Sequence, residues 1–341
     1  MAGSTPIGLD IGSSSIRAVE VRRSKDDFTL LNFGQFPLEP GIVSAGVVQD
    51  PGTVTTALKQ LWNASKFAGK KVTLAVTNPQ LVVRETSVAN LPQSQMRQAL
   101  PFQVKEQLPL AVERSLLDFY PLEQPGDNPT VRGLLIAMPK DAVLTMVQAV
   151  QKAGLKVVGV DLASFAMLRS ASRLDAQVEA IVDIGANITS VVVHADGEPL
   201  FVRTLPRGGA EITDNIATRL GMDTAGAEAL KCRYGLHGDG NPDTVAALVD
   251  AVRPLSSELR SSFTYLASGE RQKQVTRILL CGGSALMPGL AEHLQEQLGV
   301  AVMYADNASR LRDTRKARER GFDSFVPSAA VSIGLTLGAT R

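Results

Sequence analysis

The 341-residue sequence contains few of the residues that build disulfide scaffolds, metal clusters and membrane spans. Its two cysteines and three histidines are scattered and form no CxxC pair, which argues against a disulfide framework or a cysteine metal site and suits a reducing compartment. No apolar run reaches the roughly 18 to 20 residues of a membrane-spanning helix. The first residues also lack the basic region and apolar core of a signal peptide. We therefore predict a cytoplasmic protein.

Neither sign of charge is in excess. The chain has 35 basic and 34 acidic residues, a balance that argues against strong electrostatic attraction to nucleic acid. Apolar residues make up 44% of the sequence, so disorder is excluded, and the length suits about two domains or one body with two lobes.

Two short stretches far apart in the chain match each other. Leu9–Val21 reads LDIGSSSIRAVEV and Val182–His194 reads VDIGANITSVVVH, so Asp10 aligns with Asp183. Each copy has the pattern of a strand, a tight turn containing glycine and a second strand. A single Asp-x-Gly is ordinary turn chemistry. Two matched copies predict two duplicated lobes.

The paired turns are suited to a polyphosphate. Glycine with small neighbours lets backbone N–H groups approach an anion without a side chain in the way. Asp10 and Asp183, each at the end of a first strand, supply hard oxygen ligands for Mg²⁺, directly or through water. Arg17 can reach a phosphate oxygen.

A third element lies between Val275 and Gly299. Its residues predict a buried strand over 278–281, a Gly282-Gly283 turn and an amphipathic helix over 290–298. The two glycines leave a flat backbone surface on which an adenine can lie. A Gly-Gly loop without a ligand would be equally ordinary at such a place.

These three elements resemble the first phosphate, second phosphate and adenosine motifs of the actin-like ATPase superfamily. Ala227–Gly235 (AEALKCRYG) also resembles the Glu-x-x-Lys helix on the nucleoside side of the cleft in bacterial actin relatives. A plain surface ion pair between Glu228 and Lys231 is the alternative. The resemblance implies ATP and Mg²⁺ as cofactors. It also implies an α/β actin-like ATPase fold, with two duplicated lobes around a nucleotide cleft and a small α+β insert subdomain.

The insert resembles that of the PilM family of type IV pilus assembly proteins. The matching stretches are Asn90–Leu100 (NLPQSQMRQAL), Val104–Leu110 (VKEQLPL) and Leu116–Leu122 (LLDFYPL), and the start GLDIGSSSIR at Gly8 is particularly specific. The similarity covers nearly the whole chain. Pro101 falls within a helix of the family, so we expect a kink or break there.

The resemblance implies an ATP-binding scaffold at the inner face of the cytoplasmic membrane. Its partner would be the cytoplasmic N-terminal peptide of the membrane protein PilN, held in a groove that involves the insert and the first lobe. Other platform proteins of the pilus are further candidate partners. Nucleic acid is not expected, and contact with the membrane would be indirect, through partners.

Two other functions stay open. A small-molecule kinase of the same superfamily would need a general-base Asp in a first-lobe substrate pocket, and residues 87–160 offer no convincing one. A filament-forming relative of FtsA would need a C-terminal amphipathic helix, whereas Gly334–Arg341 is short and uniformly apolar or small. The basic run 310–320 is interpreted as a solvated loop, with phosphate, acidic lipid or an acidic partner as alternatives.

Hydrolysis would need a group that positions water, and the sequence identifies none clearly. Asp161, in the connecting segment, is the candidate catalytic carboxylate, with a helix N-cap as the alternative. The other candidates fall into two groups. The residues expected to bind phosphate and magnesium are Asp10, Gly12, Ser13, Ser14, Ser15, Arg17, Asp183, Gly185, Ala186 and Asn187. The residues expected to bind the nucleoside are Gly208, Gly209, Glu228, Lys231, Gly282, Gly283 and Ser284.

The predicted domain boundaries follow from these elements. The first lobe takes residues 1–86, 159–177 and the C-terminal helix 328–341; the insert takes 87–158, including a helix over 142–153; the second lobe takes 178–210 and 274–327; a mostly helical subdomain that caps the nucleoside takes 211–273.

Overall fold

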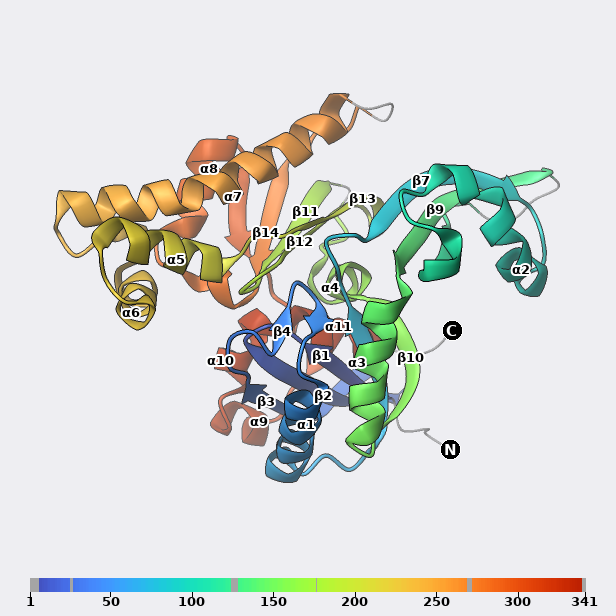
Figure 1. Cartoon of the computed structure of the whole chain (residues 1–341), viewed down its shortest axis with the longest axis horizontal. Helices are drawn as coiled ribbons and strands as arrows, with labels where there is room; N and C mark the ends of the chain where they lie inside the picture. Colours follow the sequence, from blue (N-terminus) through green and yellow to red (C-terminus); the bar gives the residue numbers. More distant parts are fainter. Residues whose placement is uncertain (1–5, 25–26, 124–127, 176, 269–271, 339–341) are drawn as a thin grey trace.

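The computed structural model describes residues 6–24, 27–123, 128–175, 177–268 and 272–338. The start of the sequence and the last three residues of the predicted C-terminal helix lie outside this part. Two sheets with their helices form two lobes, one above the other in Figure 1, and a smaller unit projects to the right.

The first lobe is built on a six-stranded sheet of order β10-β6-β1-β2-β3-β16. Helices α1 and α3 lie on one face of this sheet, and α4 and α11 pack together on the other. Its strands are β1 (Ile7–Ile11), β2 (Ser15–Ser24), β3 (Asp27–Pro37), β6 (Lys71–Val76), β10 (Lys156–Leu162) and β16 (Leu311–Arg312). Its main helices are α1 (Pro51–Ser65), α3 (Lys140–Lys152), α4 (Ala163–Ala171) and α11 (Ala330–Gly338).

Local sequence explains where α1 begins. Pro51 occupies its first turn, where a missing N–H costs nothing, and Asp50 is the N-cap residue. The Asp50 carboxylate accepts hydrogen bonds from the backbone N–H groups of Gly52 at 2.9 Å and Thr53 at 3.0 Å. Its buried side chains, among them Leu58 and Leu61, join the first-lobe core.

The second lobe repeats the strand order of the first, because β13-β12-β11-β14-β15 matches β3-β2-β1-β6-β10. The repeat extends to hydrogen bonds, since Gly12 N–H donates to Ser15 O at 3.0 Å and Gly185 N–H to Ile188 O at 2.9 Å. The predicted duplication is thus confirmed. The strands are β11 (Val178–Ile184), β12 (Thr189–Ala195), β13 (Glu198–Leu205), β14 (Arg277–Cys281) and β15 (Ala301–Tyr304).

Four helices complete the second lobe in the described residues. They are α5 (Gly209–Leu220), α6 (Thr224–Tyr234), α7 (Pro242–Ser268) and α8 (Leu290–Leu298). Helices α7 and α8 contact the sheet of this lobe, and α6 packs on α5 (Figure 1). Gly221 ends α5 in the left-handed region with φ 63°, and the Asp223 carboxylate then caps α6 by accepting from Gly226 N–H at 2.6 Å. The predicted helical character of this region is confirmed.

The insert is a three-stranded antiparallel sheet of order β7-β9-β8 with one helix. Its elements are β7 (Val82–Ala89), α2 (Gln93–Gln103), β8 (Ser115–Pro121) and β9 (Thr130–Pro139). A small core that includes Val88, Leu100 and Leu135 holds the helix on the sheet. Helix α2 continues through Pro101 and ends two residues later, so the break expected at Pro101 coincides with the end of the helix.

Three segments lie in units other than those predicted. Helix α3 and residues 156–158 of strand β10, assigned to the insert, belong to the first lobe, where Lys156–Leu162 pairs with β6. Residues 311–327, assigned to the second lobe, also belong to the first. There β16 pairs with β3, and the short helices α9 (Arg315–Glu319) and α10 (Phe322–Phe325) join a core with Phe33. Residues 82–86, assigned to the first lobe, lie in insert strand β7.

The two lobes share one hydrophobic core through α4, which lies between them in Figure 1. The buried cluster that fills the first lobe includes Ala166 and Met167 of α4. It continues into the second sheet at Ile181, Val192 and Leu279. The two lobes are therefore joined by packing contacts as well as by the chain that connects them.

Candidate functional site

The two predicted phosphate hairpins lie at the carboxyl ends of β1 and β11. Gly12–Ser14 joins β1 to β2, and Gly185–Ile188 joins β11 to β12. The backbone N–H groups of four turn residues donate to no acceptor within the described part of the chain. These residues are Ser13, Ser14, Ala186 and Asn187. Free N–H groups at two matched turns are suited to an anion.

Asp10 and Asp183 end the two first strands and influence each other. Burial raises the pKa of Asp10, while the charge of Arg17 lowers it. Burial also raises the pKa of Asp183 to about 6, and the negative charge of Asp10 adds to this effect. Two partly dehydrated carboxylates that repel each other are a favourable place for a cation.

Arg17 lies beside the first turn. Its Nη1 is 3.8 Å from Asp10 Oδ2, and its Nε donates to Ser328 Oγ at 3.2 Å. A Cβ atom on Gly12 would lie 3.7 Å from the same Nη1, so the guanidinium borders the open side of the turn. It is placed to contact an anion held there.

The second turn is in close contact with the start of α5 and with the Gly-Gly loop after β14. Gly209 N–H donates to Gly185 O at 2.9 Å, and Ser284 Oγ donates to the same oxygen at 3.0 Å. A Cβ atom on Gly208 would lie 2.5 Å from Ala186 O, closer than any real side chain tolerates. The structure thus brings these predicted residues together.

Gly282 shows why glycine is needed in this loop. Its φ of 94° lies in the left-handed region, and a Cβ atom would meet Asp183 Oδ1 at 2.3 Å. Its backbone therefore lies directly against the second carboxylate. Gly283 is exposed next to it and has open space where a side chain would be.

Lys231 and Glu228 form more than a surface ion pair. The Lys231 side chain is buried, and its ammonium donates to Gly209 O at 3.0 Å, Thr213 Oγ1 at 2.7 Å and Glu228 Oε2 at 2.6 Å. Burial opposes ionisation of Glu228, but hydrogen bonds from Lys231 and Thr213 outweigh it and lower the pKa of this carboxyl. Half-exposed Glu228 keeps a charged face towards solvent.

The hairpin serines differ in accessibility. Ser14 and Asn187 are exposed, and Ser13 is partly exposed. Ser15 is 1% exposed, and its hydroxyl has no hydrogen-bond partner among the described residues. The Ser15 side chain therefore lies inside the hairpin and not on its open face.

Asp161 lies at the same sheet edge as Asp10, two strands away. It pairs with Ala75 of β6, which is level with Asp10 of β1, so two strand spacings, about 10 Å, separate the two backbones. Its carboxylate forms an ion pair with Arg169 and accepts from Leu162 N–H at 2.8 Å. Asp161 does not cap α4, because Leu162 is the N-cap residue.

Two further residues contribute to the site and were not predicted from the sequence. Thr213 bridges Lys231 and Glu228. It stands four residues after the predicted site residue Gly209 on α5, so helix spacing places it on the same face of the helix and could have identified it. Ser328 holds Arg17 across 311 positions of sequence. No local sequence pattern predicts such a contact.

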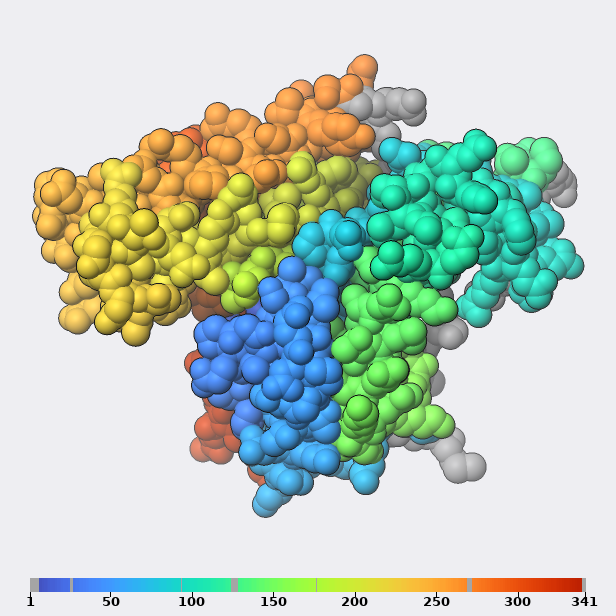
Figure 2. All heavy atoms as spheres, viewed as in Figure 1, coloured from blue at the N-terminus to red at the C-terminus, as the bar shows by residue number. Residues whose placement is uncertain are grey.

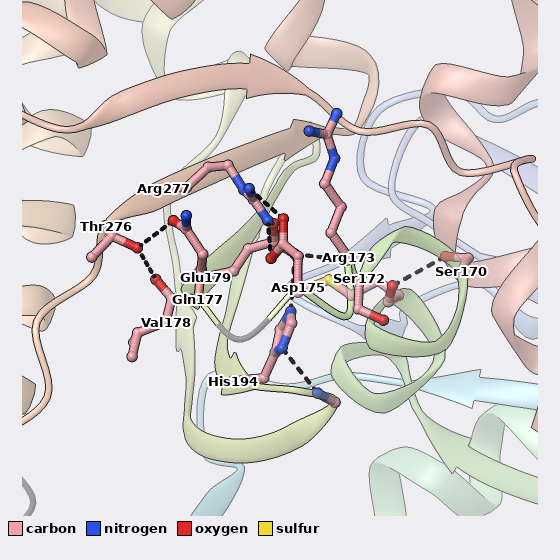
Figure 3. A network of polar contacts seen from close by, with 12 residues as sticks. Ser170, Ser172, Arg173, Asp175, Gln177, Val178, Glu179, His194, Thr276 and Arg277 are labelled. Carbon is pink, nitrogen blue, oxygen red and sulfur yellow. Dashed lines mark hydrogen bonds and ion pairs between the residues drawn. The ribbon is translucent and has the colours of Figure 1, made fainter.

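The connection between the lobes is anchored to the second sheet by a buried network (Figure 3). Fully buried Glu179 accepts from Arg173 N–H at 3.0 Å and Arg277 Nε at 2.6 Å, and lies 3.0 Å from His194 Nε2. Arg277 also donates twice to Asp175, at 2.9 Å each. Burial opposes ionisation of Glu179, but these hydrogen bonds outweigh it and lower its pKa.

No group of three or more His, Cys, Asp or Glu side chains suited to a metal occurs in the described ranges. A separate cavity of about 520 Å³ on the outer side of α7, lined by Val245, Ala246 and Val249 among others, contains none of the predicted site residues.

Comparison with known families gives a match along almost the whole chain. The family model described as type IV pilus assembly protein PilM matches residues 8–340. The chain belongs to the PilM family. The family prediction made from the hairpins and the insert is thus confirmed.

The solved structures agree with this assignment. The structure described as the PilM-PilN type IV pilus biogenesis complex has a TM-score of 0.85 and 28% sequence identity to this chain, covering 99% of both. MreB5 of Spiroplasma citri bound to ADP has a TM-score of 0.59 at 12% identity, covering 99% of this chain and 96% of its own. The predicted actin-like ATPase fold is confirmed.

The curated relatives are cell division proteins. FtsA of Streptococcus pneumoniae serotype 2 (strain D39) is 24% identical over 369 residues, which cover 94% of this chain and 79% of FtsA. FtsA of Bacillus subtilis (strain 168) is 22% identical over 377 residues, covering 97% and 86%. These distant similarities fit membership of one superfamily.

Proposed function

We propose that this protein is a nucleotide-binding scaffold of the type IV pilus assembly machinery, and that it binds the cytoplasmic N-terminal peptide of PilN. The observation that carries the proposal is the likeness to the PilM-PilN complex, at a TM-score of 0.85 over 99% of the chain. Membership of the PilM family supports it.

The proposed nucleotide is ATP with Mg²⁺. The free N–H groups of the two turns would hold the phosphates together with Arg17, while Asp10 and Asp183 would hold Mg²⁺, directly or through water. The residues fit this group, since a cation relieves the repulsion that raises the pKa of Asp183. Bound Mg²⁺ would neutralise phosphate charge.

The nucleoside would lie between the start of α5, helix α6 and the Gly-Gly loop. Glu228 presents a charged oxygen there, fixed by Lys231 and Thr213. Exposed Gly283 and the buried backbone of Gly282 offer the flat surface expected for a base. We propose binding as the primary function. Asp161 is the candidate to position water in any turnover, held by its ion pair with Arg169.

The proposed peptide site involves the insert and the first lobe. Four large apolar side chains are exposed on the insert and on β10, the outer strand of the first sheet. They are Phe102 at 86%, Leu116 at 38%, and Val158 and Val160 at 44% each. Exposed apolar side chains beside a free sheet edge are suited to an extended, partly apolar peptide.

No helix within the described ranges is both long and apolar enough to cross a bilayer. We propose a location in the cytoplasm at the inner face of the cytoplasmic membrane, because a scaffold that binds the cytoplasmic peptide of a membrane protein works at that surface. The other pilus platform proteins remain proposed partners.

Calorimetry with the full chain tests both parts of the proposal. Mg-ATP and the PilN N-terminal peptide are titrated into wild type, Asp10→Ala, Asp183→Ala and a control, Asp214→Ala, whose residue is exposed on α5. We expect peptide binding to all four proteins and at least about a tenfold loss of nucleotide affinity in the two cleft variants only, since each loses a charged cation ligand.

Two results would contradict it. Failure of the peptide to bind any of the four proteins would refute the scaffold. ATP consumption that requires an added small metabolite would indicate the kinase function. A family model that covers residues 8–340 as PilM favours the scaffold over both the kinase and the FtsA-like filament.

A further inference from the structure

One end of the first lobe collects basic residues that are scattered in the sequence. Strands β1, β6 and β10 run parallel and begin at one edge of the first sheet, opposite the edge that carries Asp10. Antiparallel β2 ends at this edge, and α1 and α3 end next to β6 and β10. Six exposed residues form this surface, which we call the basic end: Arg22, Lys66, Lys70, Lys71, Lys152 and Lys156.

Backbone contacts place these residues side by side. Lys156 N–H donates to Lys70 O at 2.8 Å, and Lys156 is the partner of Lys71 across β10 and β6. Lys152 is the last residue of α3, four positions before Lys156. Lys66 follows α1 directly and leads into β6. In Figure 1 these helix ends lie at the bottom of the lower lobe, away from the second sheet.

None of the six side chains has an ion-pair partner among the described residues. Glu20, on the same strand as Arg22, is buried and accepts from the backbone N–H groups of Ala68 and Gly69. Helix C-termini account for a positive charge at Lys66 and Lys152 but not at the four residues on or before strands. The basic end is therefore a set of like charges that no described acidic side chain pairs with.

The basic run of the sequence behaves differently. Arg312 pairs with Asp27 at 3.0 Å, Arg315 with Glu319 at 2.9 Å, and Arg318 with Asp313 at 2.5 Å. Arg310 donates to the Ser172 carbonyl at 3.1 Å. The charges of the segment 310–320 are thus largely neutralised by ion pairs, whereas those of the basic end are not.

We propose that the basic end binds the anionic lipid headgroups of a membrane surface. Five of its six cations are lysines, whose ammonium is a point charge suited to diffuse attraction, whereas paired recognition of a single anion favours arginine. The whole chain carries only +1, so the attraction is local and acts within a screening length of about 8 to 10 Å.

This inference goes beyond the proposed function, which brings the protein to the membrane only through partners. It does not depend on nucleotide or peptide binding. Each lysine near an anionic surface strengthens binding by about a factor of five, so three of them contribute about 100-fold.

Vesicle co-sedimentation of the full chain tests the proposal. The probes are vesicles of phosphatidylcholine and phosphatidylglycerol at two to one, and vesicles of phosphatidylcholine alone. The test variant carries Lys70→Gln, Lys71→Gln and Lys156→Gln. The matched control carries Arg312→Gln, Arg315→Gln and Arg318→Gln and loses the same charge. Thermal melting verifies that both fold.

We expect wild type and control to bind the anionic vesicles, the lysine variant to lose about 100-fold in affinity, and salt near 1 M to abolish binding. Equal binding to both kinds of vesicle, or equal loss in the two variants, would overturn the proposal. Binding of polyglutamate or an oligonucleotide without vesicle binding would assign the basic end to another polyanion and overturn it as well. PilN peptide binding, measured on the same proteins, reports separately on the proposed function.

Discussion

At the scale of single residues, the two cleft carboxylates make folding less favourable while preparing the site for a ligand. Asp183 is partly buried, with one carboxylate oxygen against Gly282, whose backbone leaves no room for a water shell on that side. The charge of Asp10 adds repulsion, and Arg17 offsets only part of it. Groups arranged in this way gain from a cation, and carboxylates with strongly perturbed pKa values cluster at functional sites.

Replacing Asp183 by Asn should stabilise the protein while removing nucleotide affinity. The folded state raises the pKa of Asp183 from 3.8 to about 6, so it binds this proton more tightly than the unfolded chain does. The free energy of unfolding therefore falls as pH rises from about 4 to 6. We expect Asp183→Asn to raise the free energy of unfolding at pH 7 by roughly 1 to 3 kcal/mol and to weaken this pH dependence.

Urea unfolding of wild type and variant at about pH 4 and at about pH 7, below and above the range in which Asp183 loses its proton, provides the measurement. Asp214→Asn, at an exposed position on α5, serves as the control and should change stability little. A variant that is less stable than wild type at neutral pH would show that the Asp183 charge is not a cost to the fold.

Much of the site at this scale follows from sequence. The internal match between the two hairpins predicts that Asp10 and Asp183 occupy equivalent turns, because a strand, turn and strand with the same spacing folds in the same way twice. Ser328 could not be predicted, since only the return of the chain to the first lobe brings it to Arg17. That the two hairpins bind ATP stays a prediction.

At the scale of elements, the crossing of α4 and α11 depends on the absence of a side chain. A Cβ atom on Gly334 would lie 1.7 Å from Ala166 O, a backbone atom that cannot move aside. On strand β1, a Cβ atom on Gly8 would lie 2.1 Å from the backbone oxygen of Ser332 in α11. Glycine at these positions sets how closely α11 packs on α4 and β1.

Gly334→Ala should therefore destabilise the first lobe. Alanine gains about 1 kcal/mol in helix propensity, but overpacking against backbone costs more, and we expect a net loss of at least about 2 kcal/mol in the free energy of unfolding. Gly159→Ala in β10 of the same lobe is the control, because its Cβ would meet the Thr73 side chain at an ordinary 3.7 Å. Denaturant titration that finds Gly334→Ala as stable as the control would refute the close crossing.

The sequence predicts where a helix begins and ends better than it predicts which other elements that helix packs against. The hydrophobic periodicity of residues 142–153 predicts a helix, and α3 covers Lys140–Lys152. Its place against α1 depends on Val143, Met146 and Val150 meeting the first-lobe core, and no local pattern specifies which core an apolar face will meet. The parallel pairing of β10 with β6, across about 85 residues of sequence, is likewise invisible to local periodicity.

At the scale of the whole molecule, the shared core makes the two lobes one cooperative unit. Helix α4 packs against both sheets, and the network of Glu179 and Arg277 fixes the connection that follows it. The space-filling view shows the lobes in broad contact along their common side (Figure 2). A substitution that destabilises the second lobe should therefore also destabilise the first.

Arg277→Met tests this coupling, with Trp62 of α1, the one tryptophan of the sequence, as a probe in the first lobe. The substitution leaves fully buried Glu179 without its arginine, and breaking such a buried pair costs about 3 to 5 kcal/mol, or a fall in Tm of roughly 5 °C or more. Asp175→Asn is the control, because this partner of Arg277 is 45% exposed and should contribute no more than about 1 kcal/mol.

Because the core is continuous, tryptophan fluorescence and far-ultraviolet circular dichroism should report one coincident transition that shifts as a whole. A Trp62 transition that stays at the wild-type temperature, while circular dichroism detects earlier loss of structure, would mean that the lobes unfold independently.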